Sequence, residues 1–235
     1  MRKQHLVTAL LEEKKFSEAR TLLEQIPMQK RLDSTWLPSI LALADGDGTL
    51  SQLVDEWKKQ GNPAPAENDL RDAAVHLSET GRRRVMRFVY ERAIAMRDLS
   101  APNLLGLAAI RLDDGDTPRA VDLLKRLTLI SANIEQDSDA AAQLLEDRHK
   151  PAEAISFLRA LVQDSPWNAA YKARLGIALL AVNGMDSEAP ALLSAVATDP
   201  EALYSERLTA AKARQNPAAI QARRVWWHLH PRLAW

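Results

Sequence analysis

The sequence predicts an all-α protein, a right-handed α-solenoid of about seven helix–turn–helix repeats. Three observations support this prediction. A pattern of apolar and small residues recurs about every 34 residues, which is the length of one stacked helical hairpin. Within a repeat the apolar residues follow helical spacing, as at Val121, Leu124 and Leu127. Long alternating strand patterns are missing, and the Asn-Gly and Asp-Gly pairs lack the β-branched flanks of β-hairpins.

The repeats are clearest between residues 101 and 200 and degenerate at 1–100 and 201–235. In each repeat one position is expected to lie where the two helices of a hairpin cross, so that a small side chain lets the backbones approach. Larger residues such as Leu124, Leu158 and Leu193 fill the next layer. The anchor positions of the seven repeats are Ala19, Leu53, Met86, Ala120, Ala154, Ala189 and Ala219.

The connections between the predicted helices are short and contain many of the prolines. Asp116, Thr117 and Pro118 are typical of an N-cap followed by a first helical turn. Two connections look longer than the rest, at residues 61–65 and 131–138, but neither has the length or composition of a domain boundary. We therefore expect one domain, residues 1–235.

The best repeat resembles the tetratricopeptide repeat (TPR) family. It carries the family's bulky residue, Leu-Gly pair, turn glycine, crossing alanine and closing proline, at Leu175-Gly176, Leu179, Gly184, Ala189 and Pro200. The resemblance implies stacked helical hairpins and binding of other proteins. It does not imply a particular partner, because the same hairpin serves many unrelated ones.

Composition narrows the classes of function. Lys plus Arg and Asp plus Glu are both 31, giving a formal net charge of +0, which argues against sequence-independent nucleic-acid binding. Cysteine is absent, so the chain offers no disulfide, thiolate metal site or cysteine nucleophile. No apolar run approaches the ~20 residues of a membrane span, and the N-terminus does not resemble a signal peptide. The compartment stays open between cytoplasm and periplasm, and the chain ends suggest a piece of a longer protein.

Catalytic motifs are missing from the sequence, including those of serine hydrolases, P-loop and dinucleotide-binding proteins and zinc proteases. We expect no enzyme, no cofactor and no metal site. The acidic turn from Asp45 to Thr49 resembles part of a calcium loop, but it lacks the first carboxylate and the bidentate glutamate. His228 and His230 have no neighbouring carboxylate ligand in the sequence, so helix capping is the preferred interpretation.

Two further clusters have a structural and a functional interpretation. The basic cluster is interpreted as a solvated helix face whose charge is balanced by Glu79 and Glu91, with an anion or nucleic-acid patch as the alternative. Its members are Arg82, Arg83, Arg84, Arg87 and Arg92. Near the C-terminus, Trp226 and Trp227 precede Trp235. They are expected to cap the last hairpin, to bind a partner or to support self-association, or to lie where the natural chain continues.

These observations favour a non-enzymatic scaffold whose first helices line a concave groove for a peptide or a partner helix. Their mixed charge predicts a partner that is neither simply acidic nor simply basic. The alternative is a repeat arm of a larger bacterial assembly, such as a periplasmic polysaccharide-export machine. The candidate groove residues are Arg71, Arg111, Asp139, Gln143, Glu146, Lys172 and Arg174.

Overall fold

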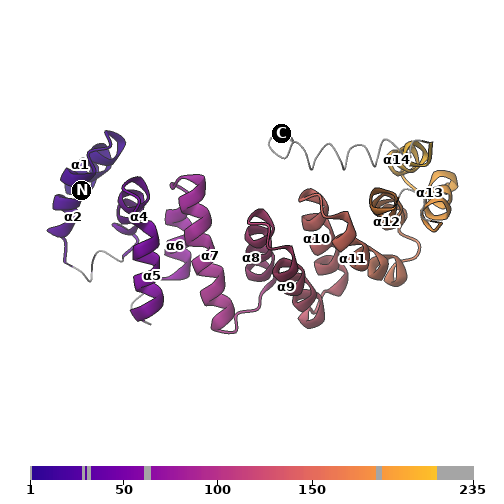
Figure 1. Ribbon diagram of the computed structural model, residues 1–235, viewed down its shortest axis with the longest axis horizontal. Coiled ribbons are helices and arrows are strands. Elements are labelled where there is room, and N and C mark those ends of the chain that lie inside the picture. Colours follow the sequence, from indigo (N-terminus) through magenta and orange to yellow (C-terminus); the bar gives the residue numbers. More distant parts are fainter. Residues whose placement is uncertain (1, 28–29, 31–32, 61–64, 184–186, 216–235) are drawn as a thin grey trace. The chain divides into compact units, whose positions relative to one another are not determined.

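A computed structural model describes residues 2–27, 30, 33–60, 65–183 and 187–215. Within these ranges the regular secondary structure consists of α-helices and contains no strand, so the all-α class is confirmed for the described part. The chain divides into two compact units, Met1–Leu99 and Ser100–Trp235 (Figure 1). In the described ranges, no helix combines the length and the apolar character needed to cross a membrane.

The described helices of the first unit follow one another in pairs. The pairs are α1 (Arg2–Glu12) with α2 (Phe16–Glu24), α4 (Leu37–Gly46) with α5 (Leu50–Gln60), and α6 (Glu67–Ala74) with α7 (Glu79–Ala95). The first helix of each pair also packs against the first helix of the next pair, α1 on α4 and α4 on α6. Each hairpin therefore shares its buried face with a neighbour.

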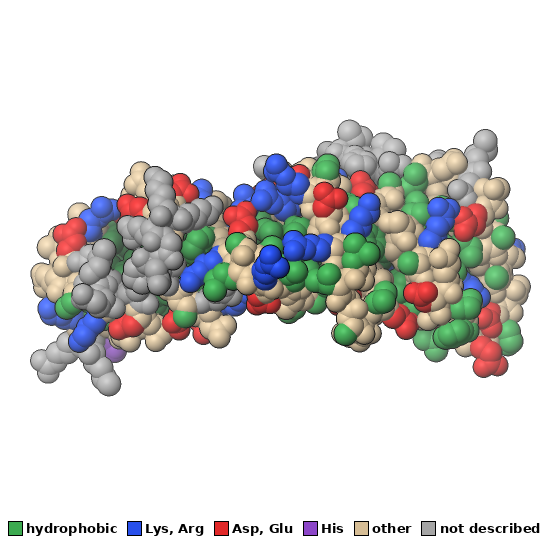
Figure 2. All heavy atoms as spheres, turned by 90° about the horizontal axis from the view of Figure 1, so that it is seen from below, with side chains coloured by type: hydrophobic (Ala, Val, Ile, Leu, Met, Phe, Trp, Pro, Cys, Tyr) green, Lys and Arg blue, Asp and Glu red, His purple; other side chains and the backbone are tan. Residues whose placement is uncertain are grey.

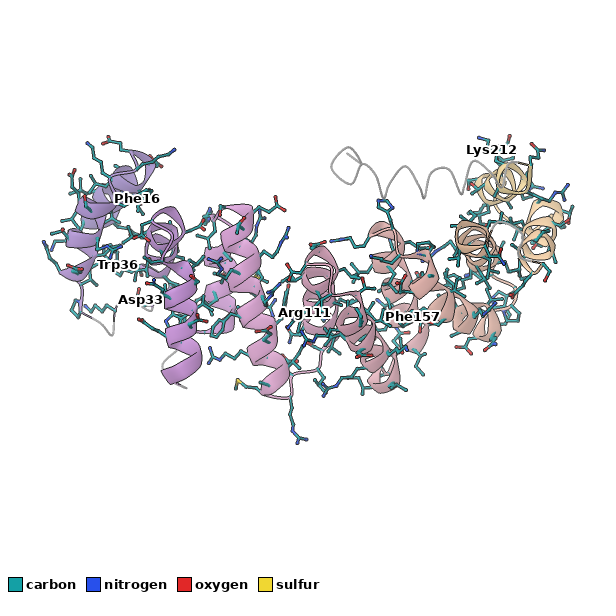
Figure 3. All side chains as sticks on the ribbon, in the orientation of Figure 1. Phe16, Asp33, Trp36, Arg111, Phe157 and Lys212 are labelled. Carbon is teal, nitrogen blue, oxygen red and sulfur yellow. The ribbon has the colours of Figure 1, made fainter. Side chains whose placement is uncertain are left out.

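Two apolar cores hold the first unit together. The first is formed by Val7 of α1, Leu23 of α2 and Leu43 of α4, and Phe16 and Trp36 pack against it (Figure 3). The second core joins α4, α5, α6 and α7. In it the centres of the Trp57 and Phe88 rings lie 5.9 Å apart. The anchor position Ala19 is fully buried, whereas the anchors Leu53 and Met86 are only half-buried and their sequence neighbours Val54 and Val85 are buried in their place.

The second unit repeats the same pairing. Its pairs are α8 (Ala101–Asp113) with α9 (Thr117–Ile130), α10 (Ile134–Asp147) with α11 (Pro151–Asp164), and α12 (Ala169–Val182) with α13 (Ala189–Thr198), followed by α14 (Tyr204–Gln215). First helices again contact first helices, α8 on α10 and α12 on α14, and each second helix packs against the first helix that follows it.

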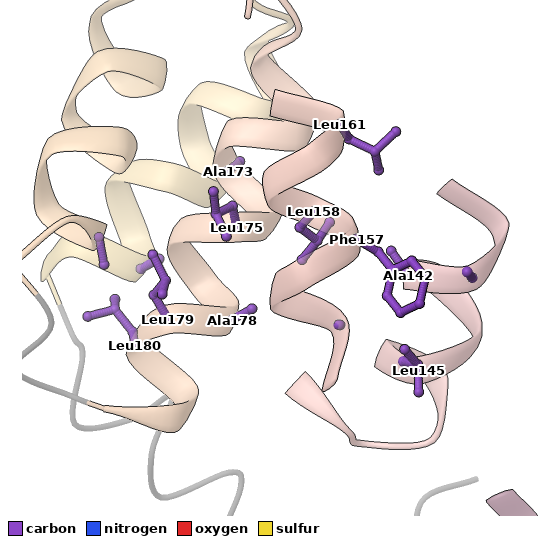
Figure 4. Close-up of a cluster of buried hydrophobic side chains, with 14 of the residues drawn as sticks. Ala142, Leu145, Phe157, Leu158, Leu161, Ala173, Leu175, Ala178, Leu179 and Leu180 are labelled. Carbon is purple, nitrogen blue, oxygen red and sulfur yellow. The ribbon is translucent and has the colours of Figure 1, made fainter. Parts of the chain in front are cut away.

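The anchor alanines explain how closely these helices approach. Ala120, Ala154 and Ala189 lie in the first turns of α9, α11 and α13, and all three are fully buried. At Gly176 of α12, an added Cβ would lie 2.8 Å from Cγ of Leu193 on α13, so only hydrogen fits there. Larger residues such as Leu158 complete the core between the helices (Figure 4).

Four of the described hairpin turns share a backbone conformation. Lys14, Gly48, Gly115 and His149 follow the first helices of their pairs, and all have positive φ, between 56° and 82°. After Lys14, Gly115 and His149, the next amide donates to a carbonyl five residues before it, at 2.8 Å in each case. This is the Schellman end of a helix, in which one residue adopts the left-handed conformation.

One predicted connection is shorter than expected. The sequence predicts a connection over residues 131–138, but α10 begins at Ile134 and the connection is residues 131–133. The polar residues of this connection instead form hydrogen bonds at the N-terminus of α10. The Ser131 hydroxyl donates to Asp137 at 2.6 Å and accepts from the Asn133 amide at 2.8 Å. Such short polar side chains occur both in loops and at helix N-termini, which is why the sequence was ambiguous.

Other predictions fall outside the described residues. They concern residues 61–64 of the longer connection at 61–65, the second helix of the last hairpin with its anchor Ala219, the pair His228 and His230, and the tryptophans Trp226, Trp227 and Trp235. These stay predictions.

Candidate functional site

The second unit brings three of the predicted groove residues into direct contact. Arg174 of α12 lies between Asp139 and Glu146, which are two helical turns apart on α10. Its Nε donates to Oε2 of Glu146 at 2.9 Å, and its Nη2 donates to the same oxygen at 2.6 Å. Its Nη1 donates to Oδ1 of Asp139. One guanidinium therefore connects two successive first helices. We call Arg174, Asp139 and Glu146 the Arg174 network.

This contact is less exposed than an ordinary surface ion pair. The side chain of Arg174 is 26% exposed. Burial by itself would lower the pKa of the guanidinium, but the hydrogen bonds that it donates to Glu146 and Asp139 outweigh burial and raise the pKa above its usual value. Arginine is charged throughout the physiological pH range, and here its forked geometry fixes the three side chains relative to one another.

A second group of hydrogen bonds lies at the N-terminal end of α10. The Tyr171 hydroxyl on α12 donates to Oε1 of Glu135 at 3.3 Å, and the buried Ser165 hydroxyl donates to the same oxygen at 3.2 Å. Burial, together with the negative charges of Asp139 and Glu135, raises the pKa of Tyr171. The phenol therefore stays protonated and keeps donating to Glu135.

Sequence reasoning missed Glu135, Tyr171 and Ser165. A signal was present for two of them, because Glu135 lies four residues before Asp139 and Tyr171 lies three residues before Arg174. These spacings place each on the same helix face as its predicted neighbour. Ser165 gave no such signal, since it lies in the connection before α12.

The remaining candidates of the second unit lie at different distances from this network. Gln143 is exposed on α10, and its spacing from Asp139 and Glu146 places it on their face of the helix. Lys172 is half-buried on α12. Arg111 lies in the last turn of α8, where Nη1 is 3.6 Å from Asp116 across the hairpin turn (Figure 3).

Arg71 belongs to the first unit. Its guanidinium lies 4.9 Å from the centre of the Tyr90 ring, a cation–π contact between α6 and α7. This contact joins Arg71 to the second helix of its own hairpin. The predicted set of seven is therefore a network of three with two neighbours, and two residues that serve their own hairpins.

The basic cluster on α7 has partners within the first unit. Arg83 donates to Glu79 one turn away, at 3.0 Å, as the interpretation of a balanced helix face predicted. Arg92 donates to the backbone carbonyl of Pro65 at 2.9 Å. Acidic and basic side chains are also interspersed on the face of the molecule in Figure 2, in keeping with the net charge of zero.

The carboxylates of the acidic turn, Asp45 and Asp47, accept hydrogen bonds near the ends of helices. Asp45 accepts a hydrogen bond from the Ser78 amide at 2.9 Å, at the N-terminus of α7, and a Cβ on Gly81 would collide with this carboxylate. Asp47 accepts from the Thr49 amide at 3.0 Å, from the Thr49 hydroxyl at 2.6 Å and from Arg20. Burial would raise the pKa of Asp47, but these bonds prevail and lower it. The two carboxylates thus serve different parts of the fold.

Among the described residues, no group of three or more His, Cys, Asp or Glu side chains is placed to hold a metal ion. No protein-family model, curated protein or solved structure matches the chain.

Proposed function

We propose that the chain is a non-enzymatic scaffold, a TPR-like helical repeat, that binds a peptide or a partner helix across α10 and α12. The observation that carries the proposal is the position of Arg174 between Asp139 and Glu146. A surface whose charged side chains are already fixed loses less conformational entropy when a partner binds.

The charges on these helices define the chemistry of the partner. α12 carries two cations, Lys172 and Arg174, and Arg174 is already shared by two carboxylates. α10 carries no basic residue in its helix but five acidic ones: Glu135, Asp137, Asp139, Glu146 and Asp147. The acids therefore outnumber the cations on these two helices, and in place of the partner of mixed charge that the sequence predicts we propose a partner segment rich in Lys or Arg.

Selection from a random peptide display library tests this proposal with the full chain as the target. Selected sequences should be enriched in Lys and Arg, and their binding should weaken as salt is added. The Gln143→Lys substitution, in the middle of the acidic face of α10, should weaken binding. Lys125→Glu on the exposed side of α9 is the matched control and should leave it unchanged. Absence of basic enrichment, or equal effects of the two substitutions, would contradict the proposal.

A further inference from the structure

Exposed apolar side chains gather at the connections between hairpins in the second unit. Trp167 is 75% exposed, Tyr204 72%, Leu203 66% and Ile134 53%. They lie at the α9–α10, α11–α12 and α13–α14 connections, in each case where a second helix ends and a first helix begins. Together with Ile130 they form what we call the connection ledge.

Hydrogen bonds show that two of these connections are neighbours. Ser165, in the α11–α12 connection, donates to Glu135 at the start of α10, and Tyr171 in the first turn of α12 donates to the same carboxylate. Ile134 and Trp167 flank this contact in the sequence. α14 packs against α12, and its first residue, Tyr204, belongs to the third connection. Because each hairpin runs out and back, all three connections lie at the same end of their hairpins.

Each of the three connections that form the ledge has an exposed carboxylate close to its apolar residue in the sequence. Glu135 follows Ile134, Asp164 precedes Trp167, and Glu201 precedes Leu203, and all three acidic residues are exposed. An apolar strip of this kind is typical of an interaction site. The carboxylates favour an occupant that combines apolar side chains with positive charge.

The chain itself contains such a segment. Residues 207–235 include no Asp or Glu, and residues 223–235 combine basic residues with three tryptophans. We propose that the connection ledge binds the chain's own segment 223–235. The basic residues from 207 onward are Arg207, Lys212, Arg214, Arg223, Arg224 and Arg232.

Chain length permits this contact. α14 begins at the ledge and has 12 residues, so its C-terminus lies about 18 Å away at 1.5 Å per residue. Residues 216–222 can span up to about 25 Å when extended, enough to return Arg223 to the ledge. Adjacent helices pack about 8–10 Å apart, and residues 223–235 can extend about 40 Å, which is enough to pass all three connections.

Site-directed cross-linking in the full chain tests the proposal, because the natural sequence has no cysteine to interfere. The test variant carries Pro166→Cys beside Trp167 and Ala234→Cys in the segment. The control carries Asp147→Cys, at the opposite end of α10, with the same Ala234→Cys. With a short bismaleimide, the effective concentration of the two thiols should make the intramolecular yield of the test variant at least about fivefold higher.

Two additional variants make the result specific. Adding Arg223→Glu with Arg224→Glu to the test variant should reduce its yield to that of the control, and so should Trp167→Ser. If Pro166→Cys disturbs folding, as judged by circular dichroism, Glu201→Cys provides a second position on the ledge.

Several outcomes would overturn the proposal. Equal yields in the test and control variants would show that the segment does not prefer the ledge. Cross-links that join two chains, and none within a chain, would assign the ledge to a second copy. A third outcome concerns membranes. If the test variant cross-links no better than the control, and the chain binds phosphatidylserine vesicles through Arg223 and Arg224, the segment would be assigned to a membrane surface instead.

Discussion

Gly115 and His149 have the same left-handed backbone conformation, with φ of +82° and +56°, at the ends of successive first helices. The amide after each donates at 2.8 Å to a carbonyl five residues before it. They are 34 positions apart (149 − 115), and so are Lys14 and Gly48 (48 − 14) in the first unit. The period of the sequence is therefore also a period of the backbone, although the side chains at the turn differ.

The turn residues should respond to glycine in a predictable direction. Lys14 is exposed and adopts φ of +57°, which is unfavourable for a side chain with Cβ. Lys14→Gly should raise the free energy of unfolding by about 0.5–1 kcal/mol, and Gly115→Ala should lower it by about 1 kcal/mol. Urea denaturation of both variants measures the effect. The same sign for both changes would contradict the assigned turn geometry.

The crossing alanines should not tolerate larger side chains. Ala154 is fully buried in the first turn of α11, so Ala154→Leu should destabilise the fold by about 1–3 kcal/mol through overpacking. The neighbouring Glu153 is half-buried, and Glu153→Leu should change stability by less than about 0.5 kcal/mol. Comparable losses for the two variants in thermal melts would mean that Ala154 is not the crossing position.

The Arg174 network should contribute more to stability than an exposed ion pair. Arg174→Gln removes the cation between Asp139 and Glu146. It should lower the free energy of unfolding by about 1–3 kcal/mol. The matched control is Arg159→Gln, which breaks an ion pair to Glu188 whose two side chains are about half exposed; its cost should stay below about 1 kcal/mol. If Arg174→Gln lowers the free energy of unfolding no more than Arg159→Gln does, the Arg174 network does not fix the surface as proposed.

The contribution of Asp47 should depend on pH in a defined direction. Its folded-state pKa lies below the ordinary value of 3.8. A depressed carboxyl pKa stabilises the fold above the unfolded-state pKa, and this contribution is lost as the pH falls through the folded-state pKa. Asp47→Asn should therefore destabilise the protein at pH 7, and the difference from wild type should shrink below pH 3.8. A difference that grows on acidification would contradict the assigned partners Thr49 and Arg20.

The features that the sequence predicts correctly depend on residues that are close together in the sequence. The helix crossings at Ala120, Ala154 and Ala189 depend on residue size at a fixed period, and their complete burial agrees with the prediction. The start of α10 was missed because Ser131 and Asn133 suit both a loop and a helix end.

The pairing of Arg174 with Asp139 and Glu146 depends on how α10 packs against α12. Sequence spacing could place these residues on the first helices, but not reveal that they contact one another. Glu135 and Tyr171 were missed for the same reason.

The central claim is that α10 and α12 present a fixed acidic surface to a basic partner segment. Hydrogen–deuterium exchange of the full chain, with and without the strongest basic peptide from the library selection, tests it most directly. The account predicts slower exchange in α10 and α12 on adding the peptide, and no slowing in the Gln143→Lys variant. Protection confined to other helices, or the same protection in the variant, would contradict it.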